Sequence, residues 1–275
     1  MKNTYLHFLT ASLVVALALV AVPAISWAEH SWGSYHWERA SNPLDLDLGE
    51  NLTANWKSFL DTARVDWNGS TVINTTIVPG GTSAKKCRPT KGQAEICNAA
   101  YGFNGWLGVA QIWVSGGHIT QGTVKNNDSY FNTSTYNTTA WKNLVMCQEV
   151  GHLFGLHHQD QNFGNVPLGT CMDYSNDPEP NQHPNFHDYE QLGLIYSHLD
   201  KPQEEGGGGP PPGRGRNRMP PAMNDMDLSG PAQWGKLQQR GHNGHTELYV
   251  LDFGQGHRVF TFVVWAEPRG RSSKH

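Results

Sequence analysis

The spacing of a few polar residues near the middle of the chain constrains its fold more than any other feature. Gln148 and His152 are four residues apart, so on an α-helix they lie on one face, about one turn from each other. Glu149 lies beside this pair, and Gly155 can take the left-handed conformation that ends a helix. The chain can then turn back and bring His158 toward the pair. Three side chains that converge in this way predict a metal site with one open coordination position.

This segment resembles the HExxHxxGxxH pattern of the metzincin clan of zinc metalloproteases, which continues to a methionine turn, here Cys171-Met172-Asp173-Tyr174. The match fails only at the first position, where Gln148 replaces histidine. The resemblance implies Zn²⁺ as the cofactor and peptide hydrolysis as the reaction. It gives roles to six residues: the metal ligands Gln148, His152 and His158, the catalytic residues Glu149 and Tyr174, and the methionine-turn residue Met172, which packs below the metal.

The amide of Gln148 is a poorer zinc ligand than an imidazole, and three interpretations of it remain open. The amide oxygen coordinates weakly and leaves an active enzyme, or His183, His187 or Asp160 takes its place, or the site binds little metal. We favour retained zinc binding, because all the other positions of the pattern are kept. Loose metal binding is then expected.

Hydrophobic periodicity predicts an α+β fold. Extended segments are expected at 35–48, 71–78, 94–99, 106–114 and 118–125, and helices at 52–67, from Thr139 onward, and at 185–196. This order resembles the metzincin catalytic domain, with a mixed twisted sheet, a metal helix, a methionine turn and a C-terminal helix, and is most similar to the small matrixin and snapalysin-type members. The resemblance also implies that the strand at Gly105–Gln111 is a sheet edge that pairs with the substrate. Its apolar character equally favours a central strand.

Composition shifts divide the chain into four parts. Residues 1–28 predict a signal peptide cleaved after Ala28, since the apolar run from Phe8 to Val22 is shorter than the ~20 residues that span a bilayer. An uncleaved membrane anchor is the alternative. Residues 29–200 form the expected metallopeptidase domain, and 201–229 a flexible linker rich in Gly, Pro and Arg. Residues 230–275 predict a small β-hairpin appendix and tail, which we expect to dock on the domain or on a partner.

Four cysteines in an exported chain predict two disulfides. The spacing favours Cys87 with Cys97 and Cys147 with Cys171, although three connectivities are possible. The second bond would join the metal helix to the methionine turn. Alternatively, Cys147 supplies the missing metal ligand, although it points about 100° away from position 148 on a helix.

The remaining composition narrows the function classes. A net charge of −4 with scattered acids and bases gives no footprint for nucleic acid. We expect a secreted, extracellular monomer that binds a peptide or protein substrate. After signal cleavage we expect it to bind no membrane. The alternatives are a metzincin-fold binding or scaffold module without activity, and a glycan-binding adhesin that uses the aromatic residues. We interpret six further histidines as ordinary surface or core residues: His30, His36, His118, His242, His245 and His257.

Overall fold

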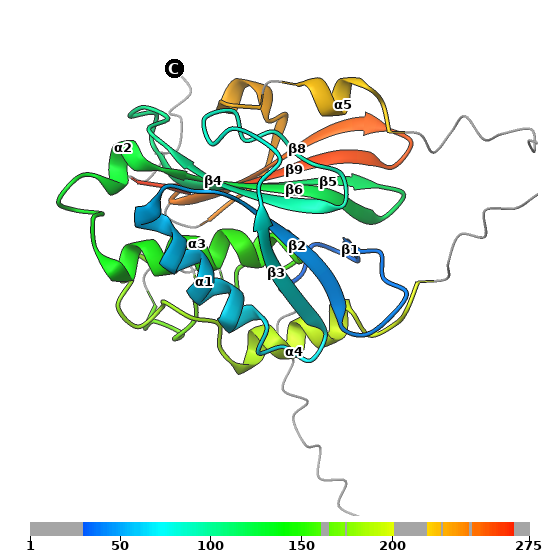
Figure 1. Cartoon of the computed structure of the whole chain (residues 1–275), viewed down its shortest axis with the longest axis horizontal. Coiled ribbons are helices and arrows are strands. Elements are labelled where there is room, and N and C mark those ends of the chain that lie inside the picture. Colours follow the sequence, from blue (N-terminus) through cyan, green and yellow to red (C-terminus); the bar gives the residue numbers. More distant parts are fainter. Residues whose placement is uncertain are drawn as a thin grey trace, which may run out of the picture.

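A computed structural model describes residues 30–160, 165–173, 175–200, 219–226, 228–241 and 244–266. One twisted sheet runs through the middle of the molecule, with the longer helices on one of its faces and the short α5 on the other (Figure 1). The predicted signal peptide and most of the predicted linker lie outside the described residues, so those parts of the domain division stay predictions.

The elements follow the hydrophobic pattern closely, which confirms the α+β fold. The strands are β1 (His36–Trp37), β2 (Leu44–Asn51), β3 (Ile73–Pro79), β4 (Gln93–Ala99), β5 (Trp106–Ser115), β6 (His118–Asn127), β7 (Lys236–Arg240), β8 (Thr246–Gly254) and β9 (His257–Trp265). The helices are α1 (Ala54–Trp67), α2 (Asp128–Phe131), α3 (Thr139–Leu153), α4 (Phe186–Ile195), α5 (Ala222–Asp225) and the 3₁₀-helix η1 (Pro231–Gln233).

The sheet is mixed, with the order β3-β2-β4-β6-β5-β9-β8-β7, and β1 pairs beside this path with β6. Strands β2, β3, β4 and β6 are parallel to their neighbours in this group, whereas β5 runs antiparallel to β6. The two C-terminal strands β8 and β9 form an antiparallel hairpin. They continue the same sheet, because β9 pairs with β5 along nearly its whole length.

The prediction that Gly105–Gln111 is a free sheet edge is therefore wrong. Strand β5 lies between β6 and β9, with a register that runs from Trp106 opposite Trp265 to Ser115 opposite His257. Alternate side chains of β5 enter hydrophobic clusters on both faces of the sheet, as is typical of an interior strand. Strand β5 is apolar along most of its length because both of its faces are covered.

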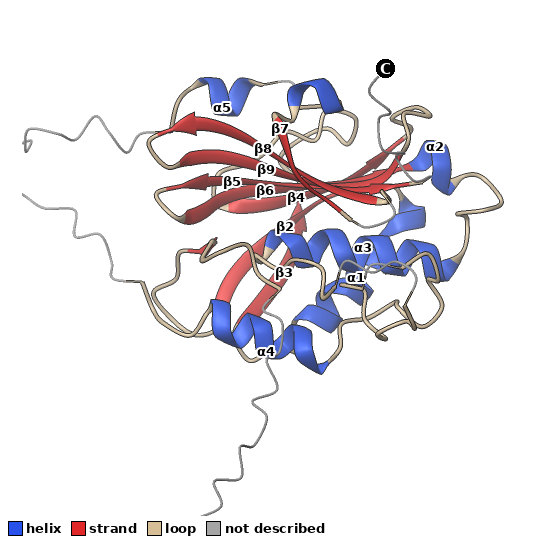
Figure 2. Cartoon of the chain, turned by 180° about the vertical axis from the view of Figure 1, so that it is seen from behind, coloured by secondary structure: helices blue, strands red, loops and turns tan. Residues whose placement is uncertain are grey.

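The two faces are covered by different parts of the chain. Helices α1, α3 and α4 lie on the face that holds the larger core (Figure 2). On the opposite face, Trp106 and Trp113 pack with Trp234 and Trp265 of the C-terminal segment. This segment thus supplies two interior strands of the sheet and a cover for its outer face.

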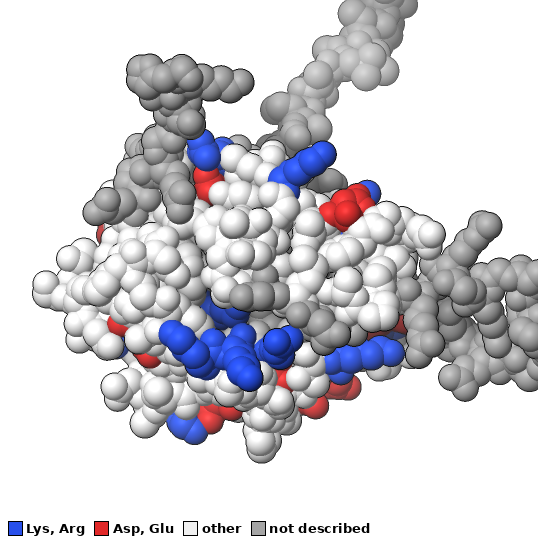
Figure 3. Space-filling view, turned by 90° about the horizontal axis from the view of Figure 1, so that it is seen from above, with Lys and Arg blue, Asp and Glu red and all other residues white. Residues whose placement is uncertain are grey.

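The outer face also carries a groove lined by four basic residues: Lys85, Lys86, Arg88 and Lys125. Figure 3 looks onto this face and shows basic side chains gathered near its middle, so the charges are less evenly scattered than the sequence suggests. No helix among the described residues has the length and apolar character needed to cross a bilayer.

Candidate active site

Helix α3 positions the predicted metal-binding residues. Thr138 caps its start by accepting a hydrogen bond from the backbone amide of Trp141, and the helix ends at Leu153. Gly155 follows with a φ of 93°, the left-handed conformation that the sequence predicts at this position. A Cβ atom at Gly155 would also approach the carbonyl oxygen of Tyr35 to 2.4 Å. Only glycine therefore allows the turn that returns the chain toward the helix.

This turn brings His158 edge-on to His152, with 4.8 Å between the ring centroids and 88° between the ring planes. His152 is fully buried, and its Nδ1 donates to the carbonyl oxygen of Leu156 at 2.9 Å. Because a carbonyl only accepts, this bond places the proton on Nδ1 and leaves Nε2 as an acceptor. Burial lowers the pKa of His152 to about 3, and burial beside the other imidazoles lowers the pKa of His158 well below its ordinary value. Both rings are therefore neutral, as metal ligands must be.

Glu149 is also fully buried, on the side of α3 that faces β5. A Cβ atom at Gly108 of β5 would lie 2.4 Å from its Oε1, so the absence of a side chain there makes room for the carboxylate. Burial raises the pKa of Glu149 well above its ordinary value, and the backbone amide of Ala110 offsets this in part. Among the described residues, no group makes a hydrogen bond of normal geometry to either oxygen of Glu149 or to Nε2 of His152. Unpaired polar atoms in so dry a place fit a site that is completed by a cation.

Gln148 is also buried, as predicted. Its amide nitrogen donates to the carbonyl oxygens of Cys171 and Asp173, at 2.9 and 3.1 Å. The amide oxygen takes no part in these two bonds. The predicted disulfides Cys87–Cys97 and Cys147–Cys171 are both present. The second ties the neighbour of Gln148 to the methionine turn, so Cys147 is not a ligand.

The other candidates for the missing ligand are engaged elsewhere. His183 lies 2.7 Å from a carboxylate oxygen of Asp66, and His187 lies 3.7 Å from Glu190. Among the described residues, neither of them, nor Asp160, forms a three-ligand cluster with His152 and His158. Met172 is buried beneath α3, where a Cβ atom at Gly151 would approach its sulfur to 2.6 Å. Tyr174 lies outside the described residues.

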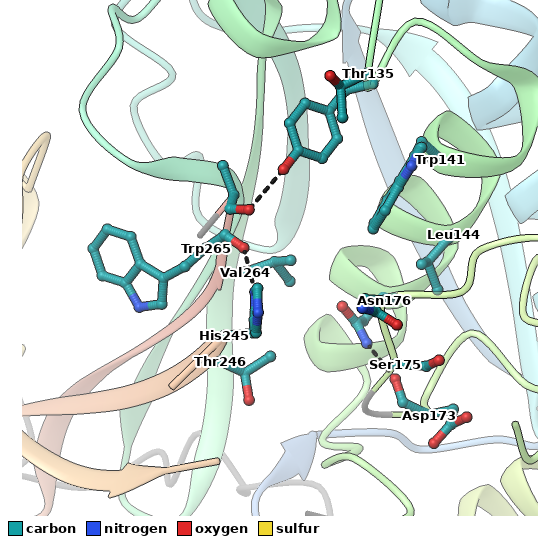
Figure 4. A pocket seen from close by; sticks show the side chains of 13 residues that line it. Thr135, Trp141, Leu144, Asp173, Ser175, Asn176, His245, Thr246, Val264 and Trp265 are labelled. Atoms are coloured by element: carbon teal, nitrogen blue, oxygen red, sulfur yellow. Dashed lines mark hydrogen bonds between the residues drawn. The ribbon is translucent and has the colours of Figure 1, made fainter. Parts of the chain in front are cut away.

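The C-terminal hairpin covers this site, which the sequence does not foretell. Phe262 of β9 stacks on His152, with 4.3 Å between the ring centroids and 11° between the planes. Where the hairpin passes His158 and Phe262, the cavity holds only about 10 Å³. A larger cavity, of about 220 Å³, lies beside Gln148. Figure 4 shows it between Trp141 and Leu144 on one side and Val264 and Thr246 of the hairpin on the other.

Comparisons with known proteins add little to this geometry. No protein-family model matches the sequence, and no curated protein does. Among solved structures, one match is high choriolytic enzyme 1, a hatching enzyme zinc-protease from the medaka fish Oryzias latipes. The match has a TM-score of 0.32 and 13% identity, and it covers 60% of this chain and 96% of that one. The function must therefore be argued from the site itself.

Proposed function

We propose that this chain is a secreted zinc-dependent endopeptidase of the metzincin type, held in a closed form by its own C-terminal hairpin. The observation that carries the proposal is the buried pair of neutral imidazoles, His152 and His158, beside the carboxylate of Glu149. These are the residue types that a catalytic zinc and its general base require.

Zinc fits the donors that are present. The imidazole nitrogens of His152 and His158 and the amide oxygen of Gln148 would hold the ion, and Met172 packs below them. An amide oxygen donates less electron density than an imidazole nitrogen, so we expect weak retention of the metal. When bound, zinc supplies the positive charge that activates a water molecule and polarises the peptide carbonyl.

The chain's own residues supply the proton transfers. The positive charge of a bound zinc would favour the carboxylate form of Glu149, which burial alone opposes. In that form Glu149 would take a proton from the attacking water and then deliver it to the leaving amine, which is the usual role of a carboxylate beside a catalytic metal. Gly108 keeps space for this carboxylate against β5. We assign Tyr174 the part of a donor to the developing oxyanion, on its position two residues after Met172.

The hairpin explains how such an enzyme stays inactive. A peptide that adds to a sheet edge makes backbone hydrogen bonds along that edge, and β9 makes the corresponding antiparallel pairs with β5. Phe262 also covers the ring of His152. Strand β9 thus stands where an extended substrate would pair, and the substrate reaches β5 only after the hairpin moves away.

The same contacts favour a second candidate function, that of a secreted binding or scaffold module without activity. The site is covered by the hairpin, and Gln148 stands in place of a third imidazole, so both features are consistent with a site that does not hydrolyse a substrate. In that case the fold and the cavity beside Gln148 serve recognition alone. The two candidates differ in whether Glu149 ever matters.

Six zinc-loaded mature proteins separate the candidates: the wild type, Glu149→Ala, Phe262→Ala, Phe262→Ala combined with Gln148→His, and the last two each with Glu149→Ala added. We expect hydrolysis of a fluorogenic peptide to appear or increase in Phe262→Ala, to increase again with Gln148→His, and to vanish when Glu149→Ala is added to either. Rates equal to that of Glu149→Ala in all of them, with zinc bound, would establish the binding module. Activity only with Gln148→His would identify a disabled site.

A further inference from the structure

Three histidines and one aspartate, none of them on helix α3, meet at a second place. His36 is in the short strand β1, and His118 opens β6, directly opposite it in the sheet register. His198 and Asp200 follow α4, close to the end of the described segment 175–200. The fold thus brings together the first strand, the sheet and the chain after the last helix of the predicted catalytic unit.

The contacts converge on one carboxylate oxygen. Oδ1 of Asp200 lies 3.2 Å from Nε2 of His36, 3.2 Å from Nε2 of His118 and 3.5 Å from Nε2 of His198. The ring of His36 makes edge contacts with the other two rings, each at 4.9 Å between centroids. The ligand atoms of His36, His198 and Asp200 all lie within 4.8 Å of one another, which is true of no other trio of His, Cys, Asp or Glu among the described residues.

The hydrogen bonds around this cluster fix its donors. Nδ1 of His36 lies 2.6 Å from the carbonyl oxygen of Ser34 and must carry a proton there, because a carbonyl only accepts. In a neutral ring the lone pair on Nε2 then points toward Asp200. Oδ2 of Asp200 accepts from the backbone amide of Arg39 at 2.8 Å.

A lone pair that faces a carboxylate is repelled unless a proton or a cation lies between them. The separations of 3.2 and 3.5 Å between Oδ1 of Asp200 and the Nε2 atoms of His36 and His198 fit a cation, because a tetrahedral ion with bonds of about 2.0–2.1 Å keeps its ligand atoms roughly 3.3 Å apart. Imidazole nitrogens with one carboxylate oxygen suit zinc better than calcium or magnesium, which prefer oxygen ligands alone. The side chain of His198 is 56% exposed, so an ion can enter from solvent.

We propose that His36, His198 and Asp200 form a structural Zn²⁺ site, separate from the predicted active site, that fastens the chain after α4 to strand β1. His118 donates to the same carboxylate oxygen and holds it in position, as groups around metal ligands commonly do. Two hydrogen bonds already join these segments. The backbone amide of Arg39 donates to Oδ2 of Asp200 at 2.8 Å, and the backbone amide of Asp200 donates to the carbonyl oxygen of Arg39 at 2.9 Å. The ion adds a metal-dependent link to them.

Zinc binding by the full mature chain tests the site. Bound zinc is counted by competition with a chromophoric chelator, and the melting temperature is measured with and without zinc. We expect His198→Gln and Asp200→Asn each to remove one equivalent of zinc and to abolish the part of the zinc-dependent rise in melting temperature that this site supplies. The matched control is His183→Gln, since His183 is 57% exposed and also pairs with an aspartate, Asp66, but belongs to no such cluster. It should bind as much zinc as the wild type.

A His158→Gln variant distinguishes this site from the proposed active site. Two equivalents in the wild type, one lost in His198→Gln and the other in His158→Gln, support both proposals. One equivalent that His198→Gln abolishes and His158→Gln leaves intact supports this site alone. Unchanged zinc content in both His198→Gln and Asp200→Asn overturns the inference while leaving the active-site proposal standing, and a wild type that binds no zinc overturns both.

Discussion

The proposed closed form makes one sharp prediction, which concerns Phe262. This side chain is 1% exposed and lies between the ring of His152 and the indole of Trp32, at centroid distances of 4.3 and 5.3 Å. Truncation of a buried phenylalanine to alanine costs about 3–5 kcal/mol. If the substitution weakens docking of the β8–β9 hairpin by about 3 kcal/mol, the fraction of molecules with the hairpin undocked rises roughly 100-fold. Each 1.4 kcal/mol changes this equilibrium by a factor of ten.

The assay is the initial rate of hydrolysis of a fluorogenic peptide at saturating zinc, corrected by subtracting the rate with Glu149→Ala. We expect a rise of up to about 100-fold for Phe262→Ala. Val263→Ala is the matched control, because Val263 is the next residue of β9 and packs on the other face of the sheet. It removes two methyl groups, about 1.6 kcal/mol, so its rise should stay near tenfold. Phe262→Ala with reduced stability but no rate above that of Glu149→Ala would refute the hairpin as a gate.

Three further predictions concern stability and the fit of the carboxylate. Gly108→Ala should lower the unfolding free energy by about 1–3 kcal/mol and abolish peptide hydrolysis, because its Cβ would meet Oε1 of Glu149 at 2.4 Å. Gly193→Ala is the control: its Cβ meets nothing within 4 Å, so the unfolding free energy from denaturant titration should rise by up to about 1 kcal/mol. Replacing Cys147 and Cys171 together by serine should lower the unfolding free energy by about 3.5 kcal/mol, the loop-closure value for a separation of 24 residues, as calorimetry would show. Burial and nearby carboxylates raise the pKa of Tyr189 from 10 to about 12. Its contribution to stability is therefore complete below pH 10 and is lost as the pH rises toward 12, so Tyr189→Phe should show a smaller fall in melting temperature than the wild type between pH 10 and 12.

Features with a local cause could be predicted from the sequence. The apolar spacing of α1 gives a buried stripe of Trp56, Leu60, Ala63 and Trp67 at helical intervals. Helix α4 begins at Asn185, whose side chain and backbone form a reciprocal capping box with Asp188. The local spacing near position 148 also correctly predicts helix α3 and the left-handed conformation of Gly155. In each case residues a few positions apart determine the structure.

The order of the strands could not be predicted in this way. Whether β5 is an edge depends on its pairing with β9, where Gln111 contacts Thr261, 150 residues further along the chain. The apolar run of β5 carried a hint, since a strand buried on both faces lacks polar alternation. No local pattern indicated which segment would pair with β5. The sequence signal at β8 and β9 predicts that these two strands form a hairpin, but it does not predict which other strand they pair with.

The second histidine cluster had even less local signal. His36 and Asp200 are 164 residues apart, and His118 and Asp200 are 82 apart. Metal-site patterns in sequences rely on ligands that share a helix or a tight turn, and only His198 and Asp200 are close in the chain. Our interpretation of His36 and His118 as ordinary residues followed from that absence of spacing. The convergence of the three segments appears only in the folded chain.

Gln148 bonds to the methionine turn and is also the proposed third metal ligand. The amide nitrogen of Gln148 carries two hydrogens and satisfies two buried carbonyl oxygens, those of Cys171 and Asp173. An imidazole that binds zinc has one N–H left, so Gln148→His leaves at least one of these carbonyls without its donor, at a cost of about 1–3 kcal/mol. The same change supplies a stronger zinc ligand. We therefore expect Gln148→His to melt below the wild type without metal and to show the larger rise in melting temperature when zinc is added. A variant that is at least as stable as the wild type without metal would show that the two hydrogen bonds contribute nothing, and Gln148 would then be explained by weak coordination alone.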